Sequence, residues 1–514
     1  MEHHRPPFRK RNRGRIIKGK KLHFAVMELN QTQQPAIVLT ADESLMSNFK
    51  HRIYYGFAPC FPTNILVESE LNKFCPPVRC HPDGRAKIAP LSLRAVESVL
   101  HKSGFKQGEY AIVHPKYLNR FVGPKTRIVG VSTIDPKGVG PITKTLRSLY
   151  GGESYTMKFF NSTMEAIKTL KKKHHVKVVV GGPGAWQLSS ETTLDSYGID
   201  YLVMGEAENI IPQLFMELVD GRTNRFPRII TGKPAMVEDI PPIIGATTNG
   251  LVEVSRGCGR GCTWCFSSTA GGMRCLPVET IKKSAETNAT NGVFDITLQS
   301  DDALLYGSKP KRFVPDSDAV LTLLKELYST EGVRSVSFLH FSAASIVADP
   351  DIIPRITAFM KSHDKRTRKH FEVQIGIETG SPHMIEKYMR GKALPFKPNE
   401  WPTIVKKASQ ILKENGWFCY ATLILGLPEE KAEDITQTID LIKNLRNSRM
   451  AFIPLFFVPV ATLKLKESSD FFHENIMQKY GLLFHELRKH NEKIASRYRR
   501  HKHILDFFLF TSNS

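Results

Sequence analysis

The chain has 514 residues, enough for two to four domains with cores of their own. No stretch is long and apolar enough to cross a bilayer, which argues against a membrane protein or a membrane partner. The N-terminus carries charge but no apolar run, so it does not read as a secretory signal. Eight cysteines in a chain of this length favour a reducing cytoplasm over a disulfide-rich secreted protein.

The net charge of +22 is concentrated partly at the ends of the chain. Residues 1–34 begin with a dense run of Lys and Arg and are predicted to be a disordered, solvated arm. Such an arm could also dock on RNA or on an acidic protein. A second basic stretch, residues 488–502, fits the exposed face of a helix in a helical C-terminal segment, residues 461–514.

Residues 35–120 form a predicted N-terminal region. It starts with a short strand over residues 35–41 and continues as a loop-rich stretch to about residue 90. Cys60, Cys75 and Cys80 lie in that stretch and raise the hypothesis of a second metal site. The high proline content and irregular spacing favour buried or incidental cysteines instead.

Strand and helix patterns then alternate through residues 91–240. Apolar runs at 110–114, 127–132, 176–180 and 199–204 predict strands, with helices over 91–103 and from about 142. This alternation predicts a doubly wound parallel sheet, in which ligands sit at the carboxyl ends of the strands. Glycine-rich turns follow three of these strands, where backbone amides can approach a large ligand: Asp135-Pro-Lys-Gly138-Val-Gly140, Gly181-Gly182-Pro-Gly184 and Gly205-Glu206.

The most specific motif is Cys258-Gly-Arg-Gly-Cys262-Thr-Trp264-Cys265. Three cysteines at this spacing can hold three irons of a [4Fe–4S] cluster and leave the fourth iron open for a substrate or cofactor. Zinc ligands usually come as two separated pairs, and a disulfide set needs an even count. The spacing therefore favours Cys258, Cys262 and Cys265 as cluster ligands. Arg256 and Arg260 beside them fit a cofactor contact or plain loop charges equally well.

A second alternating series occupies residues 241–460. Strands are predicted at 251–255, 295–300, 335–340, 371–377, 420–425 and 452–458, separated by helices such as 279–288 and 434–445. Six β/α units make one partial TIM barrel, and catalytic residues of such barrels lie at the carboxyl ends of the strands.

The cysteine spacing, the six β/α units and the glycine turns ahead of them together resemble the cobalamin-dependent radical S-adenosylmethionine (SAM) methyltransferases. The resemblance covers the chain after the basic arm and implies three cofactors: a [4Fe–4S] cluster, SAM and cobalamin. It implies a Rossmann-like cobalamin-binding domain over residues 121–240 and a radical SAM barrel over 241–460. The cobalamin contacts it implies are Ser132, Asp135, Gly138, Gly140, Gly181, Gly182, Gly184, Gly205 and Glu206.

One departure from the family pattern concerns cobalt. Some cobalamin proteins carry an Asp-x-His-x-x-Gly motif whose histidine ligates the metal, whereas the corresponding turn here reads Asp135-Pro-Lys-Gly138. The resemblance therefore implies that no histidine from this turn binds cobalt.

The same resemblance implies a SAM site at the barrel mouth. Strand ends can offer acceptors for the ammonium and ribose hydroxyls of SAM, and Gly-Ile-Glu378-Thr-Gly-Ser looks like the family's fourth-strand motif. The less favoured alternative for Glu378 is a surface or salt-bridged glutamate at a strand end. The implied SAM contacts are Trp264, Gln299, Asp301, Gln374, Glu378, Gly426 and Pro428.

Several stretches, among them Val180-Gly-Gly-Pro-Gly-Ala-Trp-Gln187, resemble an archaeal subgroup that includes the methanogen glutamine C-methyltransferase acting on methyl-coenzyme M reductase. This resemblance implies a post-translational modification. A methyl group would pass from methylcobalamin to an unactivated carbon, the α-carbon of a glutamine, after hydrogen abstraction by the 5′-deoxyadenosyl radical. The implied partners are an acidic protein substrate, which would suit the basic surface, and a low-potential electron donor.

Three other functions stay open at this point. A radical SAM enzyme that modifies tRNA, by methylthiolation for example, could use the basic segments to grip phosphates, and Cys60, Cys75 and Cys80 could then ligate a second cluster. A small molecule could be the methyl acceptor. A cobalamin or iron–sulfur sensor would not need the residues at the barrel strand ends, so it ranks last.

Overall fold

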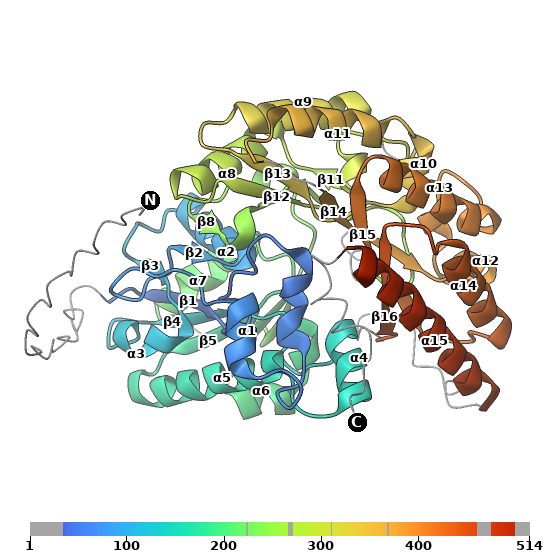
Figure 1. The fold of residues 1–514 in the computed structure, drawn as a ribbon. Coiled ribbons are helices and arrows are strands. Elements are labelled where there is room, and N and C mark those ends of the chain that lie inside the picture. Colours follow the sequence, from blue (N-terminus) through green and yellow to red (C-terminus); the bar gives the residue numbers. More distant parts are fainter. Residues whose placement is uncertain are drawn as a thin grey trace, which may run out of the picture.

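The computed structural model describes residues 34–222, 225–265, 271–309, 311–366, 370–459 and 474–498. All but the last residue of the predicted arm lies outside these ranges, as does the end of the basic stretch beyond residue 498. Figure 1 shows a parallel α/β sheet at the lower left and a partial barrel that arches over it to the right. The predicted fold class is confirmed: a doubly wound sheet, a six-stranded partial barrel and a helical C-terminal segment.

The first sheet has six parallel strands in the order β3-β1-β4-β5-β6-β7. The strands are β1 (Ile37–Ala41), β3 (Tyr110–Ile112), β4 (Ile128–Ser132), β5 (Lys177–Gly181), β6 (Tyr201–Gly205) and β7 (Ile229–Gly232). Strand β7 was not predicted, because only Ile230 of its four residues is buried and no apolar run marks it. The other five lie within two residues of their predicted positions.

Successive side chains of each strand point to opposite faces of this sheet, and helices cover both faces. In β1, Ile37 and Leu39 join the core formed with α2 (Leu91–Lys102) and α7 (Ile211–Val219). Val38 points the other way, into the core formed with α3 (Leu118–Phe121), α5 (Tyr155–His174) and α6 (Glu191–Tyr197). This two-sided burial is what an all-parallel sheet requires.

The predicted boundary between an N-terminal region and a Rossmann-like domain, at residue 121, falls inside the sheet. Strand β1 pairs with both β3 and β4, so the N-terminal strands are part of the same sheet. The pairing could not be read from the sequence, since more than 60 residues of loop and helix separate β1 from either neighbour.

The barrel strands run in chain order, all parallel, in two three-stranded groups joined by a bridge between His340 and Gln374. They are β9 (Leu251–Glu253), β12 (Asp295–Gln299), β13 (Ser335–Phe338), β14 (Phe371–Glu378), β15 (Trp417–Leu425) and β16 (Met450–Phe456). The outer arc of helices in Figure 1 covers their outer faces, and its members are α8 (Val278–Thr290), α9 (Ser317–Ser329), α10 (Ala343–Ala348), α11 (Ile352–His363), α12 (Pro382–Tyr388), α13 (Trp401–Glu414) and α14 (Ala432–Asn444).

Segments from both ends of the chain close one side of the open barrel. Tyr54, in the 3₁₀ helix η2 (Ile53–Cys60), packs in one apolar cluster with Tyr420 of β15 and Ile494 of α15 (Glu474–Arg497). The remaining short elements are α1 (Glu68–Phe74), α4 (Pro141–Tyr150) and two two-residue pairs, β2 (Ile88–Ala89) with β8 (Ala246–Thr247) and β10 (Ser255–Arg256) with β11 (Arg274–Cys275). None of the described helices has the length and apolar content needed to span a membrane.

Candidate active site

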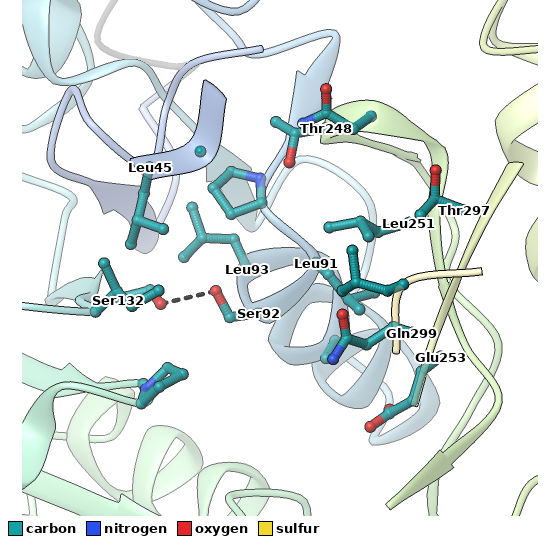
Figure 2. A pocket seen from close by; sticks show the side chains of 18 of the residues that line it. Leu45, Leu91, Ser92, Leu93, Ser132, Thr248, Leu251, Glu253, Thr297 and Gln299 are labelled. Carbon is teal, nitrogen blue, oxygen red and sulfur yellow. Dashed lines mark hydrogen bonds between the residues drawn. The ribbon is translucent and has the colours of Figure 1, made fainter. Parts of the chain in front are cut away.

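A cavity of about 1330 Å³ lies between the carboxyl edge of the first sheet and the barrel. This volume exceeds the roughly 300–1,000 Å³ of a usual small-molecule site, so the cavity has room for more than one ligand. Figure 2 shows side chains from both regions converging on it, including Ser132 from β4 and Gln299 from β12. The predicted residues that line it are Ser132, Asp135, Gly140, Gly181, Gly182, Gly205, Glu206, Gln299 and Gln374.

The turn after β4 is held by its own hydrogen bonds. The Oδ1 atom of Asp135 accepts from the Gly140 amide and from Nε2 of Gln187, each at 2.8 Å. Lys137 stands where related motifs carry a cobalt-binding histidine, and its ammonium donates to Oγ1 of Thr193 in α6, at 3.0 Å. Lys137 does not line the cavity, whereas Ile134 does and is 48% exposed. The turn therefore presents an apolar side chain, rather than a charged one, to any ligand above it.

Two predicted glycines allow the turns after β4 and β5 to touch. A Cβ atom on Gly182 (φ +97°) would lie 2.6 Å from the carbonyl oxygen of Thr133, and one on Gly184 would lie 2.4 Å from the backbone of Ile134. Gly184 is thus a packing position that does not line the cavity, and Gly138 faces a smaller pocket beside α4.

The three-cysteine loop emerges from the β10–β11 pair. Its glycines Gly257, Gly259 and Gly261 all have φ near +70°, a left-handed conformation that glycine adopts without strain. Burial, together with the neighbouring thiols of Cys265 and Cys258, raises the pKa of Cys262 to about 11. The three thiols are therefore electrostatic neighbours on one loop, with Cys262 buried and Cys258 and Cys265 half-buried.

Three cysteine thiols on one loop suit a cluster that leaves one iron open. Within the described parts of the chain, no three His, Cys, Asp or Glu side chains converge closely enough to hold one metal ion. A cubane spreads its thiolate ligands over three separate irons, so its cysteines need not converge in that way. Cys60 and Cys75 lie in one apolar cluster and Cys80 packs against another, as expected of incidental cysteines.

Arg260 has a structural role. It is 7% exposed and donates to the carbonyl oxygens of Gly391 (3.1 Å) and Leu394 (2.8 Å). It also donates to Ser345 Oγ at 2.8 Å and to the buried Asp302 carboxylate at 3.2 Å. Arg260 therefore fixes the segment 391–394 against the cysteine loop.

That segment carries Lys392, which the sequence did not single out. Its ammonium lies 3.2 Å from Oε1 of Glu378, at the end of β14. Burial alone would lower the pKa of Lys392, but the Glu378 carboxylate and the Cys262 thiol outweigh it and raise that pKa. The pair thus places one positive and one negative group beside the cysteines. No local pattern marks Lys392, because it lies in a short 3₁₀ helix, η9 (Arg390–Ala393), rather than at the end of a strand.

The second and third strand ends bring further polar groups together. Nε2 of His340 lies 2.9 Å from Oε1 of Gln374. Burial lowers the pKa of His340, and the nearby Asp301 carboxylate opposes that shift. The same Asp301 carboxylate contributes to the raised pKa of Cys258, whose largest cause is burial. Asp301 is therefore close enough to both Cys258 and His340 to influence their pKa values.

The remaining predicted residues, Gly426, Pro428 and Trp264, do not line the cavity. The Gly426 amide donates to Oε2 of Glu430 (2.9 Å) and to the Tyr480 hydroxyl of α15 (2.7 Å). Pro428 accepts a hydrogen bond from the hydroxyl of Tyr388. Trp264, beside Cys265, has a buried indole N–H with no hydrogen-bond partner in the described structure.

Comparison with known proteins identifies the barrel. The sequence model of the Radical SAM superfamily matches residues 252–442, the part of the chain that forms most of the barrel. Radical SAM domains carry a [4Fe–4S] cluster and SAM, in agreement with the cysteine motif.

Two solved structures share the fold of nearly the whole chain. TsrM from Kitasatospora setae, a radical SAM methyltransferase solved with cobalamin and a [4Fe–4S] cluster, aligns with a TM-score of 0.54 at 15% identity over 82% of this chain and 75% of its own. OxsB, a cobalamin-dependent SAM radical enzyme, aligns with a TM-score of 0.51 at 13% identity, over 89% and 56%. At these identities the likeness concerns the architecture.

The chain is also similar in sequence to curated proteins of methylthiolation. The ribosomal protein uS12 methylthiotransferase RimO of Petrotoga mobilis is 28% identical over 39% of this chain and 41% of its own length. The tRNA-2-methylthio-N(6)-dimethylallyladenosine synthase of Fusobacterium nucleatum is 25% identical over 54% and 60%. The chain thus spans only about half the length of these two relatives.

Proposed function

We propose that this protein is a cobalamin-dependent radical SAM methyltransferase. The observation that carries the proposal is the large cavity, which the glycine turns of a Rossmann-like sheet and the strand ends of a radical SAM domain build together. The fold shared with TsrM and OxsB supports cobalamin as the ligand of the sheet's edge. When bound, the cluster and SAM supply a 5′-deoxyadenosyl radical, and cobalamin supplies the methyl group.

The chain's own residues would have distinct tasks in this reaction. Cys258, Cys262 and Cys265 would hold the cluster, and the ion pair of Lys392 and Glu378 would receive the carboxylate and ammonium of SAM. The turns after β4 and β5 would support the corrin ring with backbone and with Ile134. Segment 51–60, which lines the cavity with His51, Arg52 and Cys60, would limit the access of water.

The finer proposal concerns the substrate. We propose methylation of an unactivated carbon, the α-carbon of a glutamine in a protein such as methyl-coenzyme M reductase. The resemblance of segments such as residues 180–187 to the archaeal subgroup supports this, and the net charge of +22 suits an acidic partner. The eight free thiols suit a reducing cytoplasm, where a low-potential donor would supply electrons.

The second candidate is a methylthiotransferase, which the names of the curated relatives favour. That chemistry would normally require a second cluster with three further ligands. The separation of Cys80 from Cys60 and Cys75 in different apolar clusters argues against one built from these three.

Anaerobic reconstitution with iron, sulfide and hydroxocobalamin separates the two candidates. We expect one corrinoid and one four-iron cluster per chain. S-adenosylhomocysteine and 5′-deoxyadenosine should both form when deuterium-labelled SAM, a reductant and a glutamine-containing peptide of methyl-coenzyme M reductase are supplied. A second cluster with no bound corrinoid would contradict the proposal and favour the methylthiotransferase. Corrinoid binding without methylation of the peptide would retain the cofactor assignment and overturn the substrate.

A further inference from the structure

Five charged side chains meet where the two α/β regions join: Glu206 and Glu208 after β6, Glu253 in β9, Arg256 in β10 and Arg274 in β11. We call them the interdomain clamp. The Glu206 carboxylate accepts from Nη1 of Arg256 at 2.7 Å, from both Nη atoms of Arg274, and from the Ala235 amide at 2.9 Å. Its oxygens are thus occupied by protein donors, although Glu206 also lines the cavity.

Arg256 binds carboxylates from both sides of the junction. Its Nε and Nη2 donate to Glu253 of the barrel at 2.7 and 3.0 Å, and Nη2 also donates to Glu208 of the first sheet at 2.6 Å. The side chains of Arg256 and Glu206 are each 15% exposed. Charged hydrogen bonds that are shielded from water to this degree are stronger than surface ion pairs.

The two arginines face each other across the β10–β11 ladder, in which Arg256 is the register partner of Arg274. Like charges directly opposite each other destabilise a strand pair. Glu206, which comes from the other α/β region, is the carboxylate that contacts both guanidinium groups. The ladder at the base of the cysteine loop therefore depends on a residue of the Rossmann-like sheet.

We propose that Glu206, Arg256 and Arg274 are positioning residues that fix the cysteine loop relative to the edge of the first sheet. Arg256 lies two residues before Cys258, and Glu206 follows the last residue of β6. Docking of the two regions and ordering of the loop are then one event.

The consequence for chemistry rests on the proposed function. A methyl group on one cofactor and a radical generated at the other must reach the same substrate carbon, and a misplacement of about 1 Å can cost about 100-fold in rate. The clamp would hold the two cofactor sites at a fixed separation without contacting the reacting atoms.

The first test needs no cofactor or substrate. Amide hydrogen exchange of the purified full-length chain is compared for wild type, Glu206→Gln and Glu191→Gln. The last variant is a matched control, because Glu191 pairs with Arg228 at an exposed site of the first region. We expect exchange over residues 255–265 and 271–275 to accelerate about tenfold or more in Glu206→Gln and to stay unchanged in the control. Unchanged exchange in Glu206→Gln, or equal acceleration in both variants, would overturn the proposal.

Arg274→Gln is a second variant, which tests the proposal even if Glu206→Gln fails to fold. It should accelerate exchange over the same residues, and the double variant Glu206→Gln/Arg274→Gln should be no worse than the faster single variant, because the two residues act through one contact. Additive effects would contradict a shared contact.

A spectroscopic test then asks whether the clamp sets the distance between cofactors. In the reconstituted enzyme, microwave power saturation of the cob(II)alamin signal reports its relaxation by the reduced cluster. We expect this relaxation to change in Glu206→Gln, and the ratio of 5′-deoxyadenosine formed to methyl transferred to rise about tenfold. An unaltered signal and ratio would overturn the positioning role. Failure of the wild type to bind corrinoid would instead refute the proposed function and leave the exchange result standing.

Discussion

The two α/β regions present their strand ends to the same cavity with different chemistry. At the edge of the first sheet, Gly182 and Gly184 pack turn against turn, the charged group of Lys137 is directed away, and the Asp135 and Glu206 carboxylates are already bound by protein donors. The barrel contributes Gln374 to the cavity lining and places the Lys392–Glu378 pair beside the cysteine loop. An edge whose charges are already paired suits a large ligand recognised by shape, whereas a charged pair beside the cysteines suits a small zwitterion. Changes outside the interdomain clamp should therefore affect one cofactor and spare the other.

The largest expected effect is on the barrel side. Replacing Cys258, Cys262 or Cys265 by Ala should abolish cluster binding and SAM cleavage, because in the proposed site each thiolate would hold its own iron. Corrinoid binding should remain close to that of the wild type. Iron and sulfide analysis, absorbance of bound corrinoid and assay of 5′-deoxyadenosine measure these outcomes.

Cys80→Ala is the control for loss of a cysteine, since Cys80 is half-buried and outside the cavity lining. It should keep its cluster. SAM cleavage by a variant in which Cys258, Cys262 and Cys265 are all replaced by Ala would show that these three cysteines do not ligate the cluster.

A smaller loss, of SAM affinity alone, is expected for Lys392→Met, which removes the cation but keeps most of the side-chain volume. If Lys392 pairs with the carboxylate of SAM, the dissociation constant for SAM should rise about 10- to 100-fold, the usual worth of a hydrogen bond to a charged group. Equilibrium dialysis with labelled SAM on the cluster-loaded enzyme measures this. Lys387→Met, which breaks an exposed pair with Glu429, should bind SAM normally. Equal affinities in wild type and Lys392→Met would remove Lys392 from the SAM site.

The converse test uses the first sheet. In Gly184→Ala the new methyl group would lie 2.4 Å from the backbone of Ile134, so the two turns must separate. Overpacking of this kind typically costs about 1–3 kcal/mol, and corrinoid affinity should fall about tenfold. Cluster content should not change. Gly481→Ala is the control, because nothing lies within 4 Å of its Cβ position in α15. Loss of the cluster together with the corrinoid would contradict the separation of the two sites.

The sequence predicted those parts of the site that follow strands directly. Cys258 and its partners, Gln299 and Gln374 come from local motifs or strand ends, and the parallel sheet brings strand ends together. Lys392 and the clamp were not predicted because their partners are far apart in the chain. Arg256 and Glu206 are 50 residues apart, and only the docking of two sheets reveals that they meet.

In the fold, too, local patterns were predicted from the sequence and long-range pairing was not. Periodicity placed the six barrel strands in their chain order, which is also their order in space. It could not show that β1 enters the sheet between β3 and β4, since that position depends on long-range pairing. It also missed β7, an edge strand with one buried side chain.

The smallest expected effect concerns the contact of α15 with the barrel. Burial raises the pKa of Glu430 to about 7, although hydrogen bonds from Tyr480 and Gly426 oppose the shift. A carboxyl group whose pKa is higher in the folded than in the unfolded chain favours folding below its unfolded value of about 4.5, and this contribution is lost as pH rises through about 7. Wild-type Tm should therefore fall between these pH values by about 5 °C or less relative to Glu430→Gln, which stays neutral throughout. Asp42, whose pKa burial raises to about 6, contributes equally to both proteins and cancels in the comparison. Parallel Tm profiles from differential scanning calorimetry would mean that Glu430 is ionised in the folded protein, and that the link between α15 and Gly426 does not respond to pH.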